Sequence, residues 1–141
     1  MDISNLPPFK NEPFTDFSTP DNKRAMNAAL DHVRSELGQQ YDLVLGGHHV
    51  REGQTFHSFN PAKPSEIIGT HYAAEPALAD RAVTAAQAAF TEWSRTPVTT
   101  RAALLVEAAK LLREQHFEFC AWLTFEAVSY THLTLPTKRI V

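Results

Sequence analysis

The sequence predicts a mixed α/β chain with an extended arm, one helix, short antiparallel strands and then three helices. Four stretches repeat apolar residues every three or four positions, which is the helical period. Between the first two of these stretches, short β-prone runs are separated by glycine and proline turns. Hydrophobic residues make up 43% of the 141 residues and charged residues 21%. These values lie near globular averages, so collagen-like and disordered classes are excluded.

Residues 1–18 predict an extended arm, because prolines and phenylalanines are frequent and no helical or strand period is present. The aromatic rings of such an arm need another surface to lie on. A helix follows, with Thr19 as its N-cap and Pro20 in the first helical position. Gly38 suits the left-handed residue that commonly ends a helix. The apolar stripe of this helix contains Met26, Ala29, Leu30, Val33 and Leu37.

The pattern changes to strands from Tyr41 onward. Gly46-Gly47 separates the runs 43–45 and 48–50. This arrangement predicts a hairpin, because two glycines tolerate the positive φ angles that a two-residue turn requires.

Two further strands are expected before the helical half of the chain. One covers Phe56–Phe59 and stops at Asn60-Pro61, where proline removes a backbone donor. The other covers Ile67–Tyr72 and opens after a turn around Lys63-Pro64-Ser65.

Beyond Pro76 the chain is predicted to be helical in three stretches. Thr96-Pro97 ends the first, another begins near Thr99 or Thr100, and the third runs from about His116 to Ala127. Their repeating positions are Leu78, Ala82, Ala85, Ala86, Ala89 and Trp93; then Leu104, Leu105, Ala108, Leu111 and Leu112; then Phe117, Cys120, Ala121, Leu123, Thr124 and Ala127.

Charge and cysteine content narrow the class of protein. The net charge is −3 without a basic block, which argues against a nucleic-acid partner. A single cysteine excludes an intramolecular disulfide and fits a reducing compartment. The first ten residues lack the pattern of a signal peptide, and no apolar run reaches the length of about 18 residues that a membrane span needs. We therefore expect a cytoplasmic protein with no membrane partner.

Cys120 is the only candidate thiol nucleophile. A reactive cysteine needs an electropositive and partly exposed setting that lowers its pKa. The neighbours of Cys120 are instead largely apolar and aromatic, on a predicted amphipathic helix. We interpret it as a packed core cysteine.

The other candidate site residues also favour structural roles. His48 and His49 are adjacent on a strand and point to opposite faces, so they and His57 are interpreted as surface histidines rather than metal ligands. Gly46-Gly47 is followed by a strand, whereas a phosphate-binding glycine loop is followed by a helix. Glu126 has no partner carboxylate. We expect no catalytic, cofactor-binding or metal-binding residue in this chain.

Several ordered motifs resemble the N-terminal part of the aldehyde dehydrogenase superfamily. The general motifs are Phe59-Asn60-Pro61-Ala62, Glu66-Ile67-Ile68-Gly69, Ala82-Val83 with Ala85-Ala86, Ala89-Phe90, Trp93, and Arg101 with Leu104-Leu105. Residues 8–18 and 41–47 are similar to its L-glutamate γ-semialdehyde dehydrogenase branch. The resemblance covers residues 8–127 and implies an incomplete N-terminal piece of the α/β fold of that family.

The resemblance implies NAD-dependent oxidation of an aldehyde, L-glutamate γ-semialdehyde, to L-glutamate in proline catabolism by a homo-oligomeric full-length protein. The family's nucleophilic cysteine, general base, oxyanion donors and nucleotide-binding strands follow later in its members. Cys120 does not match the nucleophile motif. The fragment itself is therefore expected to bind no cofactor and to lack activity.

The resemblance divides the chain into an arm at 1–18, a family segment at 19–127 and a tail at 128–141. The tail looks like translated sequencing-adapter sequence and is interpreted as foreign. Two alternatives stay open: an aldehyde dehydrogenase of another substrate class, or a small non-catalytic helical interaction module.

Overall fold

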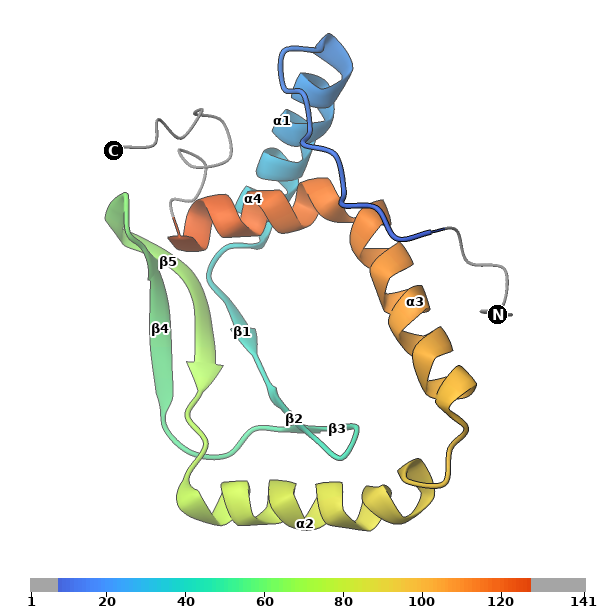
Figure 1. Cartoon of the computed structure of the whole chain (residues 1–141). Helices are drawn as coiled ribbons and strands as arrows, with labels where there is room; N and C mark the ends of the chain where they lie inside the picture. Colours follow the sequence, from blue (N-terminus) through green and yellow to red (C-terminus); the bar gives the residue numbers. More distant parts are fainter. Residues whose placement is uncertain (1–7, 128–141) are drawn as a thin grey trace, which may run out of the picture. The chain divides into compact units, whose positions relative to one another are not determined.

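The computed structural model describes residues 8–127, which fall into two compact units. The helical unit comprises residues 8–36 and 98–127, and the sheet unit comprises residues 37–97. The helical unit contains α1 (Pro20–Glu36), α3 (Val98–Glu114) and α4 (His116–Ala127). The sheet unit contains β1 (Gln39–Tyr41), β2 (Leu43–Leu45), β3 (His48–Val50), β4 (Thr55–Asn60), β5 (Lys63–Tyr72) and α2 (Pro76–Trp93) (Figure 1).

The start of α1 follows the predicted capping pattern. The Asn22 amide donates to Thr19 Oγ1 at 3.4 Å, and the Lys23 amide donates to the Thr19 carbonyl at 3.1 Å. Asp16 supports this turn by accepting a 2.8 Å hydrogen bond from the Ser18 amide. Hydrogen bonds from the Ser18 side chain and backbone lower the pKa of the Asp16 carboxyl, because they stabilise its charged form. Gly38 ends the helical region with φ 82°.

The core of the helical unit lies between α1 and α4, which contact each other. Val33 on α1 and Ala121 on α4 are both 0% exposed. Met26 and Phe125 are nearly as buried, and the Arg34 guanidinium lies 5.7 Å from the Phe125 ring centroid. Met26, Val33 and Ala121 belong to the apolar stripes predicted at the helical period, whereas the sequence analysis did not include Phe125.

The residues of the arm that the structure describes, 8–18, form no helix or strand. Phe14 is 100% exposed and Phe9 is 90% exposed, so the surface expected for these rings is not supplied by the described chain. Phe17 makes an edge-to-face contact with Phe117 of α4, with ring centroids 6.5 Å apart.

The sheet unit has a three-stranded sheet of order β1-β5-β4 and a separate hairpin, β2-β3. The β2-β3 hairpin is antiparallel, and Gly46 and Gly47 adopt φ 56° and 83°, as expected for its two-residue turn. The expected antiparallel pairs are present, and β1, which the sequence did not predict, adds a parallel pair with β5. β1 has only three residues, which are too few to show the alternation of side chains that identifies a strand in the sequence.

The turn between β4 and β5 lies earlier than expected. β5 begins at Lys63, so residues 63–65 belong to the strand. Asn60, only 8% exposed, explains this: its Oδ1 accepts from the Ala62 amide at 2.9 Å and its Nδ2 donates to Glu66 Oε2 at 2.8 Å. An Asn side chain that bonds a backbone amide two residues on closes a tight turn, so pairing resumes at Lys63.

Candidate functional site

Cys120 lies on α4 and is partly buried rather than fully enclosed. Burial raises the pKa of its thiol, because desolvation disfavours the thiolate. The Thr124 hydroxyl donates to the Cys120 carbonyl at 2.8 Å, so this hydroxyl is engaged with the backbone rather than with the sulfur. The setting is that of a structural cysteine, although the packing is looser than a core position implies.

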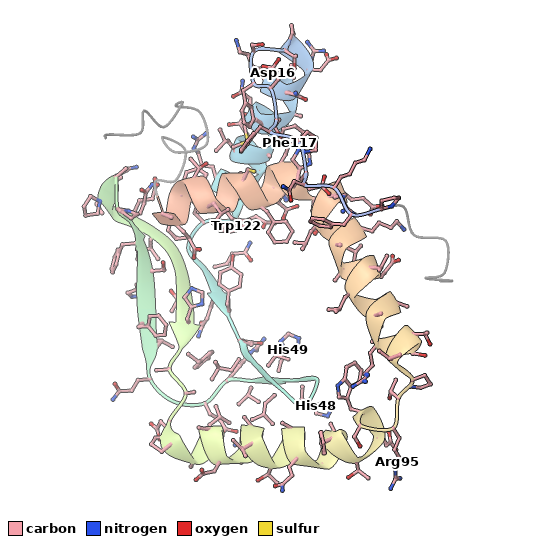
Figure 2. All side chains as sticks on the ribbon, in the orientation of Figure 1. Asp16, His48, His49, Arg95, Phe117 and Trp122 are labelled. Carbon is pink, nitrogen blue, oxygen red and sulfur yellow. The ribbon has the colours of Figure 1, made fainter. Side chains whose placement is uncertain are left out.

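The histidines of the sheet unit make separate contacts. Figure 2 shows His48 and His49 on the β2-β3 hairpin, where both are exposed. His49 Nδ1 lies 3.4 Å from Asp42 Oδ2, whereas His57 Nδ1 lies 3.0 Å from Thr70 Oγ1. Within residues 8–127, no group of three histidine, cysteine or acidic side chains converges on a point that could hold a metal ion.

Asp42 carries a contact that sequence reasoning missed. Its side chain is only 12% exposed, and both of its oxygens accept from Arg51 Nε at 2.9 Å. The pair spans the β2-β3 hairpin from outside its paired residues. The sequence signal for this ion pair was the presence of opposite charges, Asp42 and Arg51, directly before and after the predicted hairpin.

The connection from β5 to α2 is the part of the described chain that most resembles a phosphate-binding unit. A strand, a short loop and a helix follow in order, which the sequence interpretation did not identify. The loop, residues 73–75, contains no glycine, and Glu75 occupies the N-cap of α2. A carboxylate at that position repels a phosphate group, so the helix end is unsuited to a pyrophosphate.

A surface hollow of about 690 Å³ lies in the helical unit, between the arm and α3. Arg113 and His116 line one side, and Glu12 and Phe14 of the arm line the other. Arg113 forms an ion pair with Glu12, and its carbonyl oxygen lies 3.0 Å from His116 Nδ1. The charges of Glu12 and Arg113 therefore offset each other, whereas Asp16, which also lines the hollow, adds a negative charge to it.

The exposed Glu126 completes the set of candidate residues and lies on the last turn of α4. Cys120, His48, His49, His57 and Glu126 do not gather into one site within either unit. In the described residues, no helix is both long and apolar enough to cross a membrane.

The comparisons with known proteins define the class. Residues 15–134 match the aldehyde dehydrogenase family. The match covers most of the chain, so the chain belongs to the aldehyde dehydrogenase family, and the resemblance read from the motifs is confirmed.

Two curated relatives with the same enzyme name are similar to this chain. The chain is 45% identical over 120 residues to the 1-pyrroline-5-carboxylate dehydrogenase of Geobacillus thermodenitrificans, covering 85% of this chain and 23% of the relative. It is 44% identical over 120 residues to the enzyme of the same name from Geobacillus kaustophilus, with the same coverage. The chain thus spans about a quarter of the length of these relatives.

Solved structures agree with the sequence relatives. A variant of the Thermus thermophilus 1-pyrroline-5-carboxylate dehydrogenase superposes with a TM-score of 0.84 at 41% identity, covering 86% of this chain and 23% of that one. The Thermus enzyme with bound NAD gives a TM-score of 0.83 at 40% identity, with the same coverage. The elements of both units are therefore those of an incomplete aldehyde dehydrogenase fold.

Proposed function

We propose that this chain is an N-terminal segment of an NAD-dependent dehydrogenase that oxidises L-glutamate γ-semialdehyde, the open form of 1-pyrroline-5-carboxylate, in proline catabolism. The observation that carries the proposal is the 45% identity over 120 residues to a 1-pyrroline-5-carboxylate dehydrogenase. The NAD bound in a Thermus relative supports the choice of cofactor.

Within the whole enzyme, the segment supplies scaffold and no reacting group. Its lone cysteine has a raised pKa, whereas a thiol nucleophile needs a lowered one. Within residues 8–127, the only helix that follows a strand directly is α2, and the carboxylate of Glu75 at its N-cap would repel a cofactor phosphate. Both features support a structural role for residues 8–127, with the reacting groups located elsewhere in the enzyme.

The reading frame beyond Ala127 tests the proposal. Amplification of the locus from source DNA, past the codon for Ala127, is expected to yield a longer frame that continues in the family pattern. The purified product of that frame is expected to form NADH with pyrroline carboxylate faster than with propanal or succinate semialdehyde. A stop codon directly after the codon for Val141 would support the interaction-module alternative instead. Faster turnover of another aldehyde would support another substrate class.

A further inference from the structure

We draw no further inference here: the strongest candidate, the surface hollow between the arm and α3 in the helical unit, is lined on its apolar side by Phe14 and Leu112, and nothing among residues 8–127 shows what ligand or chain segment covers it.

Discussion

Helices α3 and α4 follow one another in the helical unit, yet only α4 has a covered face. α4 buries Ala121 and Phe125, at 0% and 7% exposure, in the unit where it contacts α1. α3 is longer, carries the more regular leucine row and buries no residue. A helical period in the sequence therefore identifies an apolar face, but whether that face is buried depends on the tertiary contacts of the helix.

The largest effect is expected at the covered face. Phe125→Ala removes a buried ring and is expected to destabilise the α1–α4 packing by about 3–5 kcal/mol. Leu105→Ala, at 74% exposure, is the matched control on the uncovered face. Circular dichroism of the 141-residue chain during urea titration measures the difference. Equal losses of helical signal for the two variants would show that α4 is no better packed than α3.

A smaller effect is expected in the sheet unit, at Gly69. A Cβ at this position would lie 2.8 Å from Tyr41 Cε2, and the Tyr41 ring stacks on His71 with centroids 5.3 Å apart. Gly69→Ala is therefore expected to cost about 1–3 kcal/mol by displacing that ring. Gly47→Ala would be an unsuitable control because of its positive φ, so Ser65→Ala on exposed β5 backbone serves instead. Near-ultraviolet circular dichroism of the tyrosine signal checks the displacement.

The smallest effect concerns the partly buried thiol of Cys120 on α4. Its pKa is raised by burial, so the folded chain binds the proton more tightly than the unfolded chain. This contribution to stability is present below the unfolded pKa and is lost as pH rises through the folded pKa. Iodoacetamide alkylation is expected to be slow near neutral pH and to accelerate at a higher pH than for the urea-unfolded chain. Identical pH profiles for the two forms would show that the thiol is not shielded.

The residues show which parts of the fold could be predicted from sequence. Strong local signals sufficed for α1, with Thr19 and Gly38 at its ends, and for the hairpin with two glycines. β1 was missed because three residues give no period and its partner strand is distant in sequence. The β4-β5 turn was misplaced because Asn60 controls it through a side-chain contact. The apolar neighbours of Cys120 in the sequence indicated a thiol with a raised pKa. The ion pair of Asp42 was missed because its partner, Arg51, lies nine residues away across the hairpin.

We propose that this segment contributes surface and packing to a dehydrogenase and none of its reacting groups. The most direct test mixes the purified 141-residue chain with NAD⁺ and pyrroline carboxylate, follows NADH absorbance, and titrates NAD⁺ by calorimetry. We expect no NADH above the no-protein control and no heat of binding, since burial raises the pKa of the Cys120 thiol and the helix that follows β5 has the Glu75 carboxylate at its N-cap. Turnover that disappears in Cys120→Ala would contradict this proposal, because it would place the nucleophile on α4.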